Sequence, residues 1–125
     1  MRVLGFLLAV AVSLAACSTD PEGTRLGLRT AESQVGSTTC PAAATRFRIE
    51  RDGSEMVFVD AGSDEPWPVV WPFGFAAWLE FDLAVLYASD GTVVGREGDV
   101  LDNIGGAEVE GGAFRVCSVG ARTYH

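Results

Sequence analysis

Residues 84–96 read AVLYASDGTVVGR, two short apolar runs on either side of Asp90-Gly91. Asp-Gly is among the strongest short-range signals for a β-hairpin, because these residues tolerate the positive φ angles of tight hairpin turns. Two more pairs of short runs flank such a signal: residues 45–51 and 55–59 flank Asp52-Gly53, and residues 107–110 and 113–119 flank Gly111-Gly112. Repeated short strands between glycine-marked turns predict an all-β domain.

Cross-strand charges suggest how two of these hairpins are paired. In the first hairpin, a two-residue loop would set Glu50 opposite Glu55, whereas a three-residue loop would set Arg51 opposite Glu55. Opposite charges across a strand pair stabilise it and like charges destabilise it, so we favour the three-residue loop. In the last hairpin, a two-residue turn sets Glu108 opposite Arg115 and keeps the apolar residues on the other face.

After residue 17, the chain has no long segment in which apolar residues repeat with the period of a helix. The one candidate, FAAWLEF at residues 75–81, is so short that periodicity does not separate a helical turn from a strand. The pattern therefore predicts a small sandwich or barrel of about six short strands.

The amino-terminal residues have the anatomy of an export signal. Arg2 precedes an apolar run from Val3 to Ala16, and the run ends at Cys17. A basic start, an apolar stretch and small residues before a cut are typical of a signal peptide, here residues 1–16. Two alternatives are an uncleaved membrane helix, for which roughly 20 apolar residues are needed, and an ordinary secreted protein in which Cys17 is incidental.

The next segment has the composition of a tether. Residues 18–39 are rich in Ser, Thr, Gly and acidic residues, and their large apolar residues are few (Leu26, Leu28 and Val35). Such a segment buries too little surface to offset its ordering entropy. We predict a flexible tether over residues 17–39 and a folded domain over residues 40–125.

The charge of the chain excludes some classes of partner. All nine basic residues are arginine, and removing Arg2 with the signal leaves eight of them against 17 acidic residues, a net charge of −9. Nucleic-acid binding depends on cationic contacts to phosphate, so no nucleic-acid partner is expected. Electrostatic docking on anionic lipid is disfavoured for the same reason.

Two cysteines remain after Cys17, namely Cys40 and Cys117. In an oxidising compartment outside the cytoplasm, an even number of cysteines predicts a disulfide. Metal ligation is the competing use, but no neighbouring histidine or third cysteine completes a tetrahedral set.

The residues needed for common catalytic sites are scarce. The chain has one histidine, His125 at its end, and no lysine to act as a base. Glu80 with Asp82, and Asp99 with Asp102, are carboxylate pairs by proximity alone, so a hydrolase is a remote alternative. Asp60, Asp64 and Glu65 could ligate Ca²⁺, although their spacing matches no EF-hand loop. We predict a non-enzymatic protein without a cofactor.

Aromatic residues concentrate between positions 67 and 81, with Trp67, Trp71 and Trp78 among them. One reading places them in the core, since each buries a large area. A domain of this size cannot enclose them all, so the other reading is a recognition surface for a protein, a peptide or a sugar.

Several short motifs resemble those of a bacterial protein group. Leu14-Ala15-Ala16-Cys17 looks like a lipobox, and WPFG at 71–74, DGTVVGREGD at 90–99, Gly105-Gly106 and Cys117 resemble elements of uncharacterised small lipoproteins of GC-rich bacteria. The resemblance implies an OB-like β-barrel and no established activity. It also implies that Cys17 carries a diacylglyceryl thioether and an acyl chain such as palmitate, which would anchor the protein on the extracytoplasmic side of the membrane.

These observations lead to one functional hypothesis with two alternatives. The favoured hypothesis is a membrane-anchored envelope lipoprotein whose domain contacts an envelope protein or a cell-wall glycan. The alternatives are a small-ligand or Ca²⁺ binding module and the remote carboxylate-dependent hydrolase.

Overall fold

The computed structural model describes residues 23–33, 40–109, 111–120 and 122–124, and these ranges contain β-strands and turns without a helix. The all-β prediction is confirmed, but the strands number ten rather than about six. They are β1 (Thr24–Leu26), β2 (Ala42–Asp52), β3 (Glu55–Asp60), β4 (Val69–Val70), β5 (Ala76–Glu80), β6 (Leu83–Tyr87), β7 (Val93–Arg96), β8 (Val100–Glu108), β9 (Phe114–Val119) and β10 (Arg122–Thr123).

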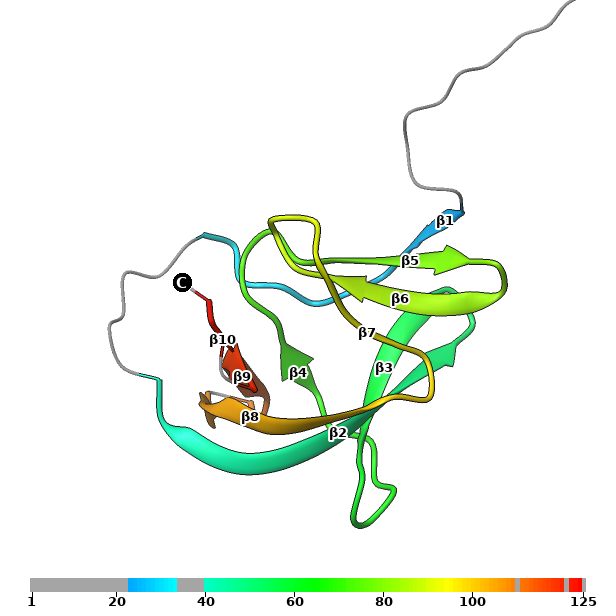
Figure 1. Cartoon of the computed structure of the whole chain (residues 1–125). Coiled ribbons are helices and arrows are strands. Elements are labelled where there is room, and N and C mark those ends of the chain that lie inside the picture. Colours follow the sequence, from blue (N-terminus) through cyan, green and yellow to red (C-terminus); the bar gives the residue numbers. More distant parts are fainter. Residues whose placement is uncertain (1–22, 34–39, 110, 121, 125) are drawn as a thin grey trace, which may run out of the picture.

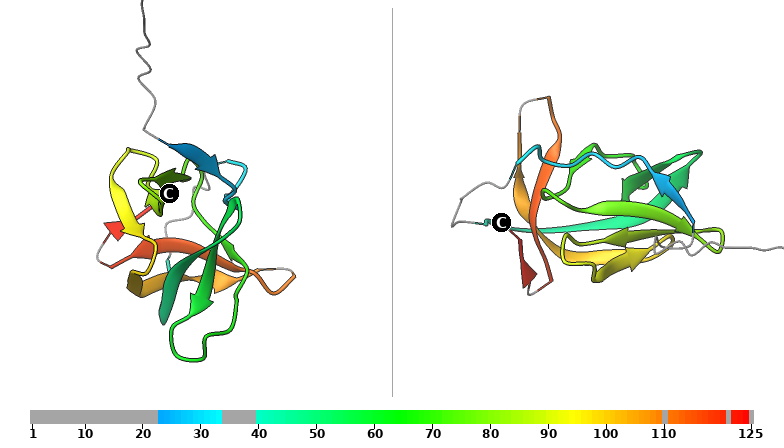
Figure 2. Two further views of the ribbon diagram at one scale, coloured as in Figure 1. Left: turned by 90° about the vertical axis from the view of Figure 1, so that its right-hand side faces the viewer. Right: turned by 90° about the horizontal axis from the view of Figure 1, so that it is seen from above.

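The strands form two sheets (Figure 1). One has the order β1-β5-β6-β7, and the other has the order β10-β9-β8-β2-β3 with β4 parallel to β9. The long β2 curves beneath the molecule and pairs with β3 on one side and β8 on the other (Figures 1 and 2). Within the described ranges the two sheets do not close into a barrel.

The core lies between the sheets because the strands alternate buried and exposed side chains. On β2, Phe47 and Ile49 are fully buried while Arg46 is exposed and Arg48 half-buried. Burial of apolar surface contributes roughly 25 cal/mol per Å², so these side chains fix which face of β2 turns inward. The largest side chains that are completely enclosed are Trp71, Phe47, Ile49, Leu86 and Ile104.

The β2–β3 hairpin has neither of the registers considered from the sequence. Asp52 pairs with Glu55 and Ile49 with Phe58, so the turn consists of Gly53 and Ser54. Gly53 has a φ of 61° and stands first in the turn, where a two-residue hairpin turn favours glycine. The like charges of Asp52 and Glu55 face each other at the exposed end of the strands, where water screens their repulsion.

The β8–β9 hairpin is offset by one residue from the predicted register near its turn. Ala107 lies opposite Arg115, and the Val109 amide donates to the Ala113 carbonyl at 2.8 Å, which brackets a longer turn. A bulge between Gly105 and Gly106 then shifts the pairing. Gly106 allows the close approach, because a Cβ there would lie 2.0 Å from the Arg115 carbonyl oxygen.

The β6–β7 hairpin is confirmed around Asp90-Gly91, with Tyr87 opposite Val93. The ambiguous segment 75–81 contains strand β5, which pairs along its whole length with β6. The carboxyl end of β5 turns into β6 through Phe81 and Asp82, both of which have positive φ angles.

The segment 23–31, called here the N-terminal strap, belongs to the fold, so the prediction of a flexible tether is wrong for these residues. Thr24 pairs with Leu79 of β5, the Gly27 amide donates to the Ser54 carbonyl at 2.8 Å, and the Ala31 amide donates to the Trp71 carbonyl at 2.9 Å. Leu26 is 4% exposed within the core. These hydrogen bonds and the burial of Leu26 offset the entropy lost when the strap is ordered, which the composition alone did not indicate.

The remaining amino-terminal predictions cannot be compared with the fold. Residues 1–16 and Cys17 lie outside the described residues, as does most of the remaining tether. In the part of the chain that the structure does describe, no helix is long and apolar enough to cross a membrane.

The predicted disulfide is present between Cys40 and Cys117, whose Cα atoms are 5.8 Å apart. It joins the chain just before β2 to the bulged part of β9. The bond thereby links two strands that flank β8 on opposite sides.

Candidate binding pocket

The aromatic segment had two readings, a part of the core or a recognition surface that includes Trp67, Trp71 and Trp78. Trp71 is 0% exposed, so the core reading holds for this residue and its place on a recognition surface is wrong. Its ring lies 4.9 Å from the Phe58 ring and stacks on Phe75 at 5.8 Å, which places it at the centre of the core. The chain turns after Pro72 through the exposed Phe73 and Gly74, and the Trp71 backbone pairs with the strap, where its amide donates to the Arg29 carbonyl at 2.9 Å.

Trp67 and Trp78 are both half-buried and lie on different elements. Trp67, between β3 and β4, packs edge-on against Phe47 and Phe114. Trp78 lies on β5, where the Arg25 guanidinium sits 5.4 Å from its ring centre. Both rings therefore already have partners in the fold, a cation–π contact in the case of Trp78.

The carboxylates considered for Ca²⁺ binding are not gathered into a site. Asp60 accepts hydrogen bonds from the Gly62 and Ser63 amides at 2.7 and 3.0 Å, while Asp64 lies 2.6 Å from Nη2 of Arg48. Across residues 23–33 and 40–124, as far as they are described, no three His, Cys, Asp or Glu side chains could together hold a metal ion. Asp60, Asp64 and Glu65 instead shape the loop that follows β3.

The carboxylates considered for hydrolysis also have structural contacts. Glu80 accepts a hydrogen bond of 2.5 Å from the Tyr87 hydroxyl, and this bond, more than burial, raises the pKa of Tyr87. Asp99 accepts from the Arg96 amide at 2.8 Å, and Asp102 pairs with Arg46 at 2.7 Å. None of these contacts lies in the pocket described next.

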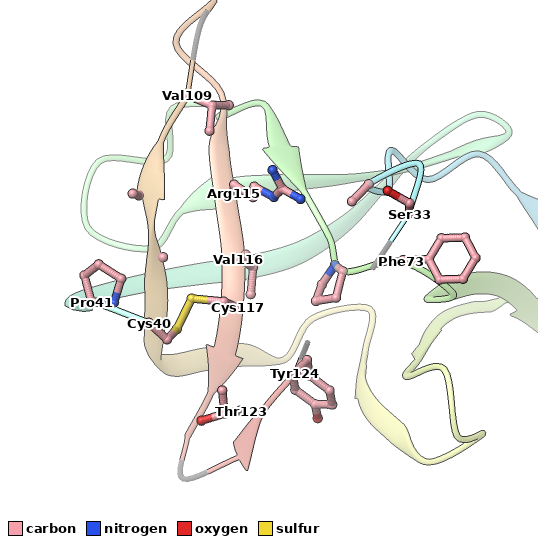
Figure 3. Close-up of a pocket in the computed structure, with 14 residues that line it drawn as sticks. Ser33, Cys40, Pro41, Phe73, Val109, Arg115, Val116, Cys117, Thr123 and Tyr124 are labelled. Atoms are coloured by element: carbon pink, nitrogen blue, oxygen red, sulfur yellow. A yellow bond between two sulfur atoms is a disulfide. The ribbon is translucent and has the colours of Figure 1, made fainter. Parts of the chain in front are cut away.

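A pocket with a volume of about 270 Å³ opens beside the disulfide (Figure 3). One wall is β8, β9 and the disulfide, and the other is formed by the end of the strap, the Pro72-Phe73 turn and the chain after β10. Its lining residues are Ala31, Ser33, Cys40, Pro41, Pro72, Phe73, Gly106, Ala107, Val109, Arg115, Val116, Cys117, Thr123 and Tyr124.

Most of this lining is apolar, and the local sequence explains why. Ala107 presents only a methyl group on β8, and Pro72 and Phe73 close the opposite side. Phe73 is 45% exposed at the rim, so part of its ring faces solvent. An apolar hollow with a half-exposed aromatic at its edge is the usual composition of a small binding site.

Among the described residues that line the pocket, Arg115 supplies the one charged side chain. It extends from β9 between Val109 and the disulfide, toward the side of the pocket where Ser33 lies (Figure 3). The ion pairs and side-chain hydrogen bonds among the residues described do not include Arg115. A half-buried guanidinium without a carboxylate partner is a ready hydrogen-bond donor for an anionic group.

Tyr124 forms the floor of the pocket and is held from three directions. Its amide donates to the Cys117 carbonyl at 2.7 Å, its ring packs edge-on against Phe75 at 4.8 Å, and Arg122 lies 5.2 Å from the ring centre. Partial burial raises the pKa of Tyr124. The phenol is therefore neutral at physiological pH and adds no negative charge opposite Arg115.

Arg122 in turn pairs with Asp90 in the β6–β7 turn, which connects the carboxyl-terminal strand to the other sheet. The Asp90 carboxylate also accepts hydrogen bonds from the Thr92 amide and hydroxyl at 3.0 and 2.7 Å. Thr92 is the largest cause, and Arg122 the next, of an Asp90 pKa well below its ordinary value. We call the Asp90–Arg122 pair the carboxyl-terminal clamp.

The lowered pKa of Asp90 makes the clamp sensitive to acid. Its stabilising effect is fully present above the unfolded-state pKa of about 4 and is lost as the pH falls toward the lower folded value. We expect Asp90→Asn to reduce the loss of thermal stability between about pH 4 and pH 2. Circular dichroism melting at several pH values tests this, and Asp52→Asn serves as the control. A wild-type acid profile for Asp90→Asn would contradict the prediction.

A second hollow of about 490 Å³ lies between the strap and the β3–β4 region. Its lining includes two charged side chains of opposite sign, Arg29 and Glu55, and the half-buried Trp67. Neither charged side chain is in an ion pair among the described residues, but both are exposed, whereas Arg115 is half-buried against the apolar wall of the first pocket.

The pocket was missed from the sequence because its walls come from six separate segments. Two signals pointed to its parts: the cysteine pair marks one wall, and the WPFG element marks the other. Nothing in the sequence showed that the disulfide and Phe73 would face each other across a hollow. Comparison of the chain with protein-family models, curated proteins and solved structures finds no match.

Proposed function

We propose that the protein is a lipid-anchored envelope protein whose β-domain is a non-enzymatic binding module. The support for the anchor is the sequence: a basic start, an apolar run and Cys17 directly after Leu14-Ala15-Ala16. The disulfide between Cys40 and Cys117 is the kind of bond that persists outside the cytoplasm, which agrees with an extracytoplasmic location.

The observation that carries the binding proposal is Arg115, unpaired beside an apolar pocket. An apolar wall favours an apolar group, and an unpaired guanidinium favours a carboxylate, so the ligand should carry both. An apolar side chain next to a carboxylate in a partner protein meets this description. Because the pocket is about 270 Å³, it would take one side chain, with Phe73 contacting the surrounding surface.

A small carboxylate-bearing ligand is the second candidate function. The enclosed position of the pocket between the disulfide and Tyr124 favours it, since small-molecule sites are concave and mostly apolar. An OB-like relationship of the fold also stays a proposal, and its support is the long, curved β2, which is irregular between Ala42 and Phe47.

The anchor is tested by the intact mass of the protein purified from its own membranes. The proposal predicts a chain that begins at Cys17 and carries acyl groups, and it predicts release of Cys17→Ser into the soluble envelope fraction. An unmodified mass for the membrane-bound wild type would contradict the anchor, whatever the pocket does.

The pocket is tested by photo-crosslinking in cells with a benzophenone amino acid at position 73. We expect a discrete protein adduct that Arg115→Gln reduces at least tenfold, because the guanidinium supplies the charged contact. Arg46→Gln is the matched control, since Arg46 pairs with Asp102 on an exposed surface away from the pocket lining. A benzophenone at Val93, another exposed apolar position, should give no such adduct.

Two outcomes decide between partner classes. Equal adducts from Arg115→Gln and wild type would overturn the proposed role of Arg115. If no protein adduct forms, but native mass spectrometry of the domain shows a bound small carboxylate that Arg115→Gln loses, the second candidate replaces the first.

A further inference from the structure

The turn between β5 and β6 presents the most exposed large apolar side chain described in the protein. Phe81 is 88% exposed at the tip of this hairpin, and Leu83 beside it is 45% exposed. Phe81 has a φ of 50° and Asp82 a φ of 67°, so both turn residues lie in the left-handed region.

Phe81 is unfavourable at this position for two independent reasons. The left-handed conformation crowds the Cβ of any residue other than glycine, and a bulky residue there is an outlier. The other hairpin turns follow the rule, with positive φ angles at Gly53, Gly91 and Gly111. The ring of Phe81 also makes none of the aromatic contacts found in the core, so packing does not explain its presence. Residues kept in such conformations are often functional.

The tip lies where the folded domain meets the amino-terminal part of the chain. Thr24 pairs with Leu79, and a Cβ on Gly23 would lie 1.7 Å from the Leu79 carbonyl oxygen and 3.4 Å from the Glu80 Cα. The strap therefore enters the fold one residue away from Phe81. Figure 1 shows β1 beside the end of β5 that leads into this turn.

This placement puts the tip close to Cys17. Gly23 is six positions after Cys17, and a fully extended chain of that length spans at most about 22 Å. If Cys17 is lipidated, the linker keeps the tip of the hairpin within reach of the membrane surface, and contact with the bilayer becomes an intramolecular event. One aromatic and one aliphatic side chain are then enough to favour it.

We propose that Phe81 and Leu83 insert into the interfacial region of the membrane that holds the Cys17 lipid, and so fix the orientation of the domain. This inference rests on the proposed lipid anchor. It assigns the bilayer, rather than a protein, as the partner of the tip.

The charges around the tip set the depth and the lipid preference of this contact. Asp82 is exposed next to Phe81, and Glu80 is hydrogen-bonded to Tyr87. Two carboxylates cannot enter the hydrocarbon, so insertion is shallow. They also repel anionic headgroups, so contact should be stronger on phosphatidylcholine than on phosphatidylglycerol, the reverse of electrostatic docking.

The test uses the mature, lipidated protein in phosphatidylcholine vesicles that contain a diazirine-bearing lipid. After illumination and chymotryptic digestion, mass spectrometry locates the lipid adducts. We expect them to concentrate at residues 81–83, to fall at least fivefold in Phe81→Ser, and to persist in Phe81→Trp. Phe73→Ser is the matched control, because Phe73 is also an exposed phenylalanine but lies in the binding pocket, and it should leave the adducts unchanged.

A second arm separates this inference from the anchor. Unlipidated protein that begins at Cys17 is joined to vesicles through a maleimide lipid, so the tip is tested even if the cell does not acylate Cys17. Adducts spread evenly over the domain, or unaffected by Phe81→Ser, would overturn the inference in either arm. Crosslinks from position 81 to a protein in native membranes, in place of lipid, would overturn it as well.

Discussion

Replacing both Cys40 and Cys117 with alanine is expected to lower the free energy of unfolding by about 4 kcal/mol. The disulfide closes a loop between residues 77 positions apart, and its loss returns that loop's conformational freedom to the unfolded chain. The effect is large because single domains of this size are stable by only about 5–15 kcal/mol. Urea denaturation of the soluble domain, followed by tryptophan fluorescence, measures the change.

Two controls test whether the loss comes from the bond itself. Reduction of the wild-type protein should lower the urea midpoint by nearly as much as the double substitution. Each single substitution should behave like the double one, because either leaves the partner cysteine without a bond. A change below about 1 kcal/mol for the double variant would show that the loop is already restricted in the unfolded state. Because the disulfide also lines the pocket, the Phe73 crosslink should weaken in parallel.

Trp71→Ala is expected to lower the free energy of unfolding by about 4 kcal/mol. This loss is similar to that expected for the disulfide, but it comes from a cavity rather than from the unfolded chain. Trp71 is completely buried between Phe58 and Phe75, so its removal opens a cavity in the middle of the core. Thermal melting by circular dichroism should show a fall in Tm well beyond that of any surface substitution.

Trp71→Phe separates the ring from its polar atom. The indole Nε1 of Trp71 is buried and has no hydrogen-bond partner among the residues that the structure describes, which costs free energy in the wild type. Phenylalanine removes this unsatisfied group while it keeps most of the apolar contact, so the variant should lose much less stability than Trp71→Ala. Trp78→Ala is the control for loss of a half-buried tryptophan, and a cost for Trp78→Ala equal to that of Trp71→Ala would contradict the central role of Trp71.

The features that depend on local chemistry were predictable from the sequence. Asp90-Gly91 was identified as a hairpin turn because glycine there has the positive φ that the turn requires. Cys40 and Cys117 were paired by counting cysteines in an oxidising compartment. The all-β class followed from the spacing of the turns, because no segment was long enough to form a stable helix.

The features that depend on distant contacts were not predictable. Leu26 was assigned to a tether because the composition of a segment shows how much apolar surface it carries. Composition does not show that a single leucine, such as Leu26, packs into the core of the domain. Trp71 could be read as a core or a surface residue, because the strap that pairs with its backbone comes from 40 positions earlier and has no local signal at Trp71. The favoured registers of the β2–β3 and β8–β9 hairpins were each wrong by one residue, because they relied on pairing between side-chain charges. The positive φ of Gly53 and the close backbone approach at Gly106 determine the observed pairing instead.

The pocket and the hairpin tip also depend on features that the local sequence does not show. Arg115 was placed opposite Glu108 from the expected register, and the one-residue offset left it without that partner. Phe81 carried no signal as a turn residue, because its left-handed backbone contradicts the preference of its side chain. Where local preference and observed conformation disagree, as at Phe81, the disagreement itself draws attention to the residue.

When a chain appears from its amino end, the strap is present before the residues that it contacts. The strap residues bond to partners that come 27 to 55 positions later, and Cys40 bonds to Cys117. Contacts so far apart in sequence close slowly and require most of the chain to be present. The strap therefore docks only after residue 79 has appeared, and the disulfide forms only after β9 has appeared.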